Sequence, residues 1–123
     1  MKIENIKFKA KRLDNGEWII GSFVVMKIPA LSKTTIGIVA AGGATLHEID
    51  TATVCQFTGL KDCKGNEIWE HDLIHFVGHK PTGEVIWSEE DYAFMVASEN
   101  EPLYWLSDVL EIGKIERIGN KFD

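Results

Sequence analysis

Residues 54–76 read VCQFTGLKDCKGNEIWEHDLIHF, and this stretch decides the fold more than any other part of the chain. Two apolar runs typical of strands enclose a segment rich in turn-forming residues. Glycine tolerates the positive φ that a reversing backbone requires, and short polar side chains hydrogen-bond within turns. The stretch therefore predicts a strand, a tight connection and a second strand, with structural turn positions at Gly59, Asp62, Gly65, Asn66 and Asp72.

The residues before this stretch predict an N-terminal β-hairpin region. Apolar and basic residues alternate from residue 3 to residue 12, which is the pattern of a half-buried strand. The Asn15-Gly16 pair predicts a hairpin turn, because both residues tolerate positive φ, and residues 18–26 form the returning strand. A weaker pattern indicates a second hairpin within residues 36–49, and the sequence leaves most of the segment 25–47 open.

The rest of the chain predicts short strands at close spacing, at residues 54–57, 73–77, 83–87, 92–97 and 114–118. Between the last two, leucines at helical spacing predict one short helix over residues 103–110. The predicted fold class is mainly β. It consists of an N-terminal β-hairpin region at residues 1–53 and a C-terminal SH3-like small barrel at residues 54–123, packed as one compact unit.

Composition places the chain among globular proteins. It has 123 residues, of which 45% are hydrophobic and 26% are charged. The sequence contains neither an apolar run of about 18 residues nor a basic start followed by an apolar stretch. We therefore expect a cytoplasmic protein of the host cell, with no membrane partner.

The charge of −6 is unevenly distributed. Residues 1–53 carry seven Lys or Arg against five Asp or Glu, a net +2, whereas residues 54–123 carry six against fourteen, a net −8. The acidic part would repel a phosphate backbone, which disfavours nucleic-acid binding in general. The candidate nucleic-acid contacts are confined to the basic N-terminal strand, at Lys7, Lys9, Lys11 and Arg12. The favoured explanation of that alternation is an exposed charged face that prevents edge pairing.

Motifs that would carry catalysis or hold a cofactor are missing from the sequence. The glycines match neither the dinucleotide fingerprint nor the P-loop. The spacing of Cys55 and Cys63 favours two reduced thiols, and a bridge between them across a hairpin is the alternative that the sequence leaves open. His71, His75 and His79 recur every four residues, but their strand-like context would separate the first two by about 13 Å, too far for one ion. The acidic residues 89–91, near Glu84, are typical of a solvated turn. We predict no enzyme activity, no metal and no cofactor.

Large aromatic residues are numerous for so short a chain. Four Trp and two Tyr are present, and such side chains are enriched at protein interfaces as well as in cores. The candidate interface residues are Trp69, expected at the rim just after the turn, and Tyr104 and Trp105, expected at the start of the helix.

Several blocks of the sequence together resemble the YopX family of phage and prophage proteins. They are Gln56-Phe57-Thr58-Gly59-Leu60-Lys61-Asp62, Lys64-Gly65-Asn66-Glu67-Ile68, Glu70, Asp72-Leu73-Ile74, Ile6-Lys7-Phe8-Lys9-Ala10, Trp18 with Gly21, and Ile118-Gly119-Asn120. Cys63 and His71 depart from the family pattern, which has a polar residue and a glycine there. The resemblance implies a β-rich, self-associating phage-borne protein with no catalytic residue to carry over.

The leading hypothesis is therefore a non-enzymatic phage or prophage accessory protein that acts by self-association and protein binding. Its expected partners are further copies of itself and a phage or host protein. The alternative is a nucleic-acid-associated SH3-like module that uses the basic N-terminal strand. A small metal-dependent hydrolase is the least favoured hypothesis, because it rests only on the histidines and the acidic run.

Overall fold

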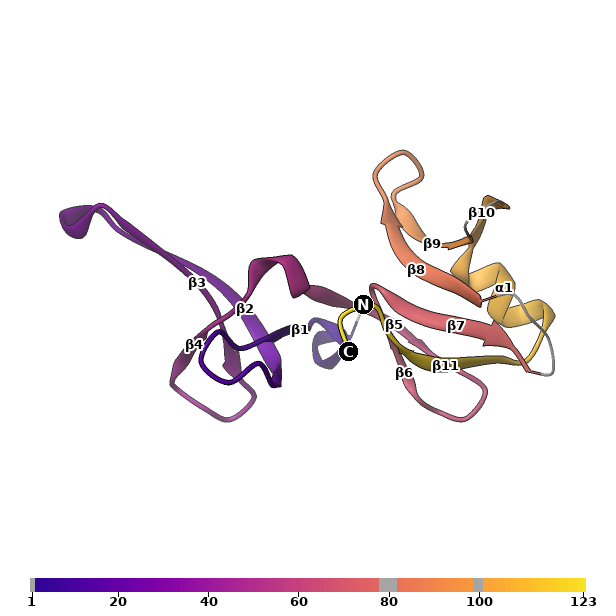
Figure 1. The fold of residues 1–123 in the computed structure, drawn as a ribbon, viewed down its shortest axis with the longest axis horizontal. Coiled ribbons are helices and arrows are strands. Elements are labelled where there is room, and N and C mark those ends of the chain that lie inside the picture. Colours follow the sequence, from indigo (N-terminus) through magenta and orange to yellow (C-terminus); the bar gives the residue numbers. More distant parts are fainter. Residues whose placement is uncertain (1, 78–81, 99–100) are drawn as a thin grey trace. The chain divides into compact units, whose positions relative to one another are not determined.

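A computed structural model describes residues 2–77, 82–98 and 101–123 of the chain (Figure 1). The chain divides into two compact units, residues 1–56 and 57–123. The division falls inside strand β5 (Cys55–Lys61), a few residues after the predicted boundary at residue 53. The first two residues of β5 pair with β1 (Phe8–Lys11), and β5 pairs with β6 (Glu67–Trp69) from Phe57 onward.

The first unit is built on antiparallel strands in the order β4-β3-β2-β1, followed by the start of β5. Its elements are η1 (Ile3–Asn5), β1, β2 (Trp18–Ile28), η2 (Pro29–Leu31), β3 (Lys33–Ala40), β4 (Leu46–Glu48) and η3 (Thr51–Thr53). The core consists of Ala10, Ile19, Ile38 and Ile49. The predicted first hairpin is confirmed, with Gly16 at φ +70°, but its first strand begins at Phe8 because residues 3–5 form a 3-10 turn.

The hairpin of β2 and β3 occupies residues 25–40 of the segment that the sequence left open, and it is longer than its neighbours (Figure 1). Strand β1 reaches only Gly21 of β2, and β4 pairs with β3 only from Gly37 to Val39. Among the described residues, the part beyond these pairings is a two-stranded ribbon, in which Val25 pairs with Ile36. We call residues 25–36 the arm.

The second unit contains the β5–β6 hairpin and a five-stranded antiparallel sheet in the order β10-β9-β8-β7-β11. The strands of this sheet are β7 (Asp72–Phe76), β8 (Thr82–Ser88), β9 (Ala93–Ser98), β10 (Glu101–Trp105) and β11 (Ile115–Asn120). Helix α1 (Leu106–Ile112) connects β10 to β11. Within the described ranges no pairing joins β10 to β11, so the sheet is not closed into a barrel. The mainly β class with one short helix is confirmed, and the closed barrel is corrected to an open sheet.

Helix α1 covers the core of the second unit. Leu106 and Val109 are buried one helical turn apart and pack with Ile68, Ile74, Val85 and Ile115. The prediction of a helix from residue 103 is wrong at its start, because residues 101–105 pair with β9 and the helix begins only at Leu106. No helix within the described residues is long and apolar enough to cross a bilayer.

Candidate functional site

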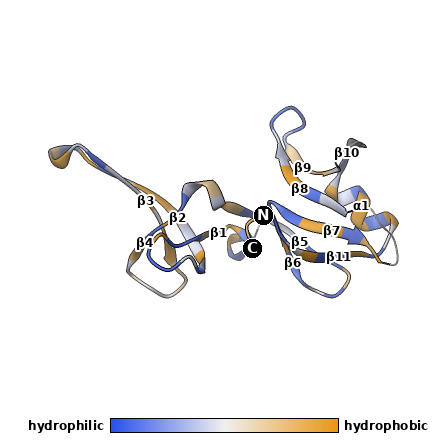
Figure 2. Cartoon of the chain, viewed as in Figure 1, coloured by the Kyte–Doolittle hydropathy of each residue, from blue (hydrophilic) through white to orange (hydrophobic). Residues whose placement is uncertain are grey.

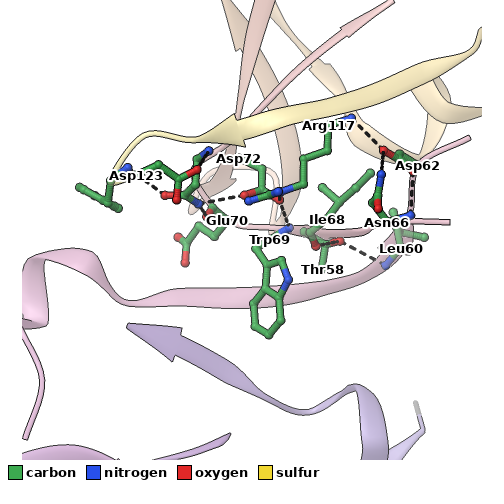
Figure 3. Close-up of polar contacts among 12 residues, drawn as sticks. Thr58, Leu60, Asp62, Asn66, Ile68, Trp69, Glu70, Asp72, Arg117 and Asp123 are labelled. Carbon is green, nitrogen blue, oxygen red and sulfur yellow. Dashed lines mark hydrogen bonds and ion pairs between the residues drawn. The ribbon is translucent and has the colours of Figure 1, made fainter. Parts of the chain in front are cut away.

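The connection between β5 and β6 is organised around the carboxylate of Asp62. This carboxylate accepts hydrogen bonds from the backbone N–H groups of Lys64 (2.9 Å) and Asn66 (2.8 Å), and from Asn66 Nδ2 (3.1 Å). A fourth bond comes from Arg117 N at 2.9 Å, so the turn is also tied to β11 (Figure 3). Asp62 therefore links the turn to a strand that lies far away in the sequence.

The surroundings of Asp62 change its proton affinity. Burial by itself would raise the pKa of this carboxyl group, since it disfavours the charged form. The hydrogen bonds from Arg117, Asn66 and Lys64 outweigh burial, and the pKa lies below its ordinary value of 3.8. The carboxylate is thus stabilised as an anion and serves as a hydrogen-bond acceptor within the fold.

Asp72 is the second carboxylate of this region and is fully buried, with 0% exposure. It accepts hydrogen bonds from Trp69 N (2.7 Å), Arg117 Nε (2.8 Å) and Asn120 Nδ2 (2.9 Å), as Figure 3 shows for Trp69 and Arg117. Asp72 therefore joins the central block, residues 54–76, to Arg117 and to the closing segment Ile118-Gly119-Asn120. The sequence placed Asp72 at a turn and assigned Arg117 no role, since a partner 45 residues away leaves no local signal.

The predicted turn glycines adopt the conformation that the sequence requires. Gly59 has φ +82° and Gly65 has φ +83°, and no atom lies within 4 Å of an added Cβ at either position. Backbone conformation, and not lack of space, therefore selects glycine at both sites. Gly59 lies where the register of β5 and β6 shifts between Phe57 and Lys61.

His71 lies in the left-handed region, with φ +68°, a backbone conformation that favours glycine. Its Nδ1 atom is 2.9 Å from Glu84 Oε2, and its ring contacts Phe122 edge-on with centroids 5.2 Å apart. Its backbone N–H donates to Val85 O at 2.6 Å. The side chain thus makes contacts that a glycine would lack, at a backbone position that glycine would adopt without strain.

We expect His71→Gly to be about 1 kcal/mol more stable than His71→Ala. Both variants lose the same side-chain contacts, but alanine must keep the left-handed conformation. Urea titration of both variants measures the difference. The same pair of substitutions at Thr34, an exposed strand residue without positive φ, should give the opposite order. Equal stability of the two His71 variants would contradict the backbone explanation.

His71 and His75, two of the three histidines that recur every four residues, contact different carboxylates. His71 pairs with Glu84, whereas His75 Nε2 lies 3.5 Å from Glu116 Oε2. Within residues 2–77, 82–98 and 101–123, no group of three or more His, Cys, Asp or Glu side chains is placed to hold a metal ion. His79 lies outside the described residues.

The acidic run after β8 forms a local turn. Ser88 Oγ donates to Asp91 Oδ2 at 2.9 Å and accepts from Asp91 N at 3.2 Å, while Glu89 and Glu90 are exposed. A separate exposed ion pair joins Lys64 Nζ to Glu116 Oε1 at 2.6 Å. This hydrogen bond lowers the pKa of Glu116 and raises that of Lys64.

The basic side chains of the N-terminal strand are less exposed to a nucleic acid than the alternation of basic and apolar residues predicts. Lys9 is only 6% exposed, with Nζ 4.5 Å from the centre of the Trp18 ring, so the expectation of a fully exposed basic face is wrong at this position. Lys11 Nζ lies 5.5 Å from the same ring, and Lys7 is partly buried. A cation over an indole ring is attracted by its π electrons.

The fourth residue of that group, Arg12, binds Asp14. Two hydrogen bonds join them, from Nε at 2.9 Å and from Nη2 at 2.5 Å. The side-chain hydrogen bond from Arg12 lowers the pKa of Asp14. A bidentate carboxylate occupies the guanidinium edge that would otherwise bind a phosphate.

The three candidate interface aromatics lie in different environments. Trp69 is 4% exposed and packs against Phe57, with ring centroids 5.2 Å apart, so the prediction that it lies at the rim is wrong. Tyr104 and Trp105 are 53% and 46% exposed on β10. They belong to a strand and not to the start of the helix, since they pair with Val96 and Met95.

Beside α1 the second unit contains an apolar cavity of about 460 Å³, which we call the groove. Residues from all five strands of the sheet and from α1 line it, including Phe76, Val96, Tyr104, Val109 and Ile112. Its size and predominantly apolar lining are those of a binding site. Tyr104 is the one predicted interface residue that borders it.

Neither Cys55 nor Cys63 forms a disulfide within the described residues. Cys55 is buried in β5, with Sγ 3.3 Å from Thr53 O, whereas Cys63 is exposed in the β5–β6 turn. A buried thiol with a carbonyl partner is a structural residue.

Two comparisons with known proteins bear on the identity of the chain. A comparison with curated proteins found no match. A family model described as YopX protein matches residues 7–123, which include the β5–β6 turn, the Asp72 ion pair and the groove. The match covers nearly the whole chain and confirms the resemblance that the central block indicates. The chain belongs to the YopX family.

Proposed function

We propose that this protein is a non-enzymatic phage or prophage accessory protein that works in the host cytoplasm by assembling with copies of itself and with a phage or host protein. The observation that carries this proposal is the arm. Three of its large apolar side chains are widely exposed, namely Val25 (50%), Met26 (45%) and Leu31 (68%). Figure 2 shows hydrophobic colours at the tip of the β2–β3 hairpin, where Leu31 lies.

A two-stranded ribbon is at best marginally stable in water by itself. A partner that covers the arm would bury apolar surface, at roughly 25 cal/mol per Å² removed from water. Each strand of the arm also has an edge without a described neighbour in the unit. Unpaired edges and exposed apolar side chains on one element are typical of a surface that is covered in an assembly.

The signature carboxylates support a structural role. Asp62 and Asp72 accept hydrogen bonds from donors of the fold itself, and no buried side-chain N or O atom within the described residues lacks a partner. A general acid or base has to exchange a proton with a substrate, which these bonds oppose. These two carboxylates of the central block therefore favour stability of the fold over catalysis.

The strand order supports an SH3-like architecture for the second unit. Four antiparallel strands, β7 to β10, follow one another, and after α1 the fifth strand, β11, returns to pair with β7. Such small sheets serve as binding modules in many unrelated proteins, so the fold agrees with binding but does not select the partner. The contacts of Lys9, Lys11 and Arg12 weigh against a nucleic acid as that partner.

Light scattering coupled to size-exclusion chromatography tests self-association of the full chain. We expect a mass that is a multiple of 13.8 kDa and that falls on dilution. The double variant Val25→Ser, Met26→Ser should weaken assembly at least about tenfold, because losing about 1.4 kcal/mol of contact energy has that effect. A strict monomer at the highest attainable concentration would contradict the proposal.

A further inference from the structure

We propose that the tip of the arm of one copy docks into the groove of a second copy, with Leu31 as its anchor. This inference rests on the self-association proposed above and names the two surfaces that meet. The proposed contact joins two different surfaces and is therefore heterologous, because the arm belongs to the first unit of one chain and the groove to the second unit of another.

The tip of the arm has the shape and chemistry of an anchor. Pro29–Leu31 form a 3-10 turn, and Ser32, in the left-handed region at φ +49°, closes it by donating its N–H to Pro29 O at 3.1 Å. This turn holds Leu31 with 68% of its surface exposed. A side chain held in a formed turn loses little conformational freedom when it binds.

The groove offers a matching apolar receptor. Phe76, Val96 and Ile112 border it, and Ile112 is itself 78% exposed. Its volume of about 460 Å³ exceeds that of one leucine side chain, so the receptor can also accept a neighbouring tip residue such as Ile28. Covering the groove would bury the exposed faces of Ile112 and Tyr104 together with that of Leu31.

Charge complementarity selects the groove, and not another arm, as the receptor. The arm carries Lys27 and Lys33, and residues 18–47 contain no Asp or Glu. Helix α1, which borders the groove, exposes Asp108 and Glu111 and contains no basic residue. Two arms would therefore repel each other, whereas the arm of one copy and helix α1 of another attract each other. The net charges of the two parts of the chain are likewise opposite in sign, with +2 for residues 1–53 and −8 for residues 54–123.

Two single variants separate the surfaces. Leu31→Asp disables the arm and Ile112→Asp disables the groove, and both positions are exposed enough to leave the fold intact. Each variant alone should show at least a tenfold loss of self-association by light scattering. Because each retains the surface that the other has lost, an equimolar mixture should form 1:1 pairs and nothing larger.

Matched controls are available on the same units. Leu13→Asp (63% exposed) and Ile118→Asp (51% exposed) introduce the same charge away from the arm tip and the groove lining. Both should keep the wild-type mass. Circular dichroism of every variant verifies that the β content is unchanged.

A charge-reversal pair provides a second measurement. The double variant Lys27→Glu, Lys33→Glu reverses the charge of the arm and should weaken assembly about tenfold. The double variant Asp108→Lys, Glu111→Lys reverses the charge of helix α1. Mixing the two variant chains should restore the association. Wild-type assembly in both Leu31→Asp and Ile112→Asp would overturn this inference and leave self-association standing. Loss in Leu31→Asp without recovery in the mixture would overturn it in favour of an arm–arm contact. A monomeric wild type would overturn the proposed function as well.

Discussion

Replacing Asp72 by alanine should lower the free energy of unfolding by about 3–5 kcal/mol, the range for removing one partner of a buried ion pair. The substitution removes the carboxylate to which Trp69 N, Arg117 Nε and Asn120 Nδ2 all donate. Arg117 is 27% exposed, so water replaces part of its lost bond and the lower half of the range is expected. Urea titration followed by tryptophan fluorescence measures the change. Against a typical total of 5–15 kcal/mol, the loss is large.

Two further variants identify the origin of this loss. Asp72→Asn keeps the shape and one acceptor oxygen but removes the charge, so its loss should be smaller than that of the alanine variant. Glu89→Ala removes an exposed carboxylate in the β8–β9 turn and should stay within about 0.5 kcal/mol of the wild type. Wild-type stability of Asp72→Ala would rule out the ion pair as a main support of the fold.

Replacing Asp62 by alanine should cost about 2–3 kcal/mol at neutral pH, as expected for lost hydrogen bonds to a charged group. The difference from wild type should then shrink in acid. The folded-state pKa lies below the ordinary value of 3.8, so the contribution of Asp62 is fully present above that value. It is lost as the pH falls through the depressed folded pKa. Urea titrations of both proteins between neutral pH and pH ~2 measure this convergence.

Asp14 provides the control for this pH effect. The pKa of its carboxyl group is also lowered, first by the hydrogen bond from Arg12, but its side chain is 63% exposed. Asp14→Ala should therefore leave stability unchanged within error at every pH, since exposed ion pairs contribute little. A stability gap for Asp62→Ala that stays constant down to the lowest pH would contradict the assigned role of its carboxylate.

The local features of the chain were predictable from the sequence because short-range rules govern them. Positive φ at Gly16, Gly59 and Gly65 follows from turn chemistry, and the mainly β class follows from alternating apolar residues. Errors arose where pairing with a distant strand overrode a local pattern. The helix starts at Leu106 because Tyr104 and Trp105 pair with β9 as part of a strand. The spacing of the leucines carries no information about that pairing.

The candidate site depended more strongly on the tertiary structure. The sequence pointed to Tyr104 as an interface residue, but its place beside an apolar groove follows from the packing of α1 against the sheet. Nothing in residues 25–36 taken alone predicts an arm, because an arm is defined by the points at which β1 and β4 stop pairing. Burial of Trp69 and Lys9 likewise results from neighbours that the folded chain brings to them.

By itself the sequence determined the central turn, the β class and the family, because each depends on residue types at short and regular spacing. Only the tertiary structure decided that the two carboxylates of the central block are buried and bound to β11. The acceptors Asp62 and Asp72 lie 55 and 45 residues from their common donor, Arg117. Such contacts form when the folded sheet excludes water and brings β11 beside β7, which no local pattern records.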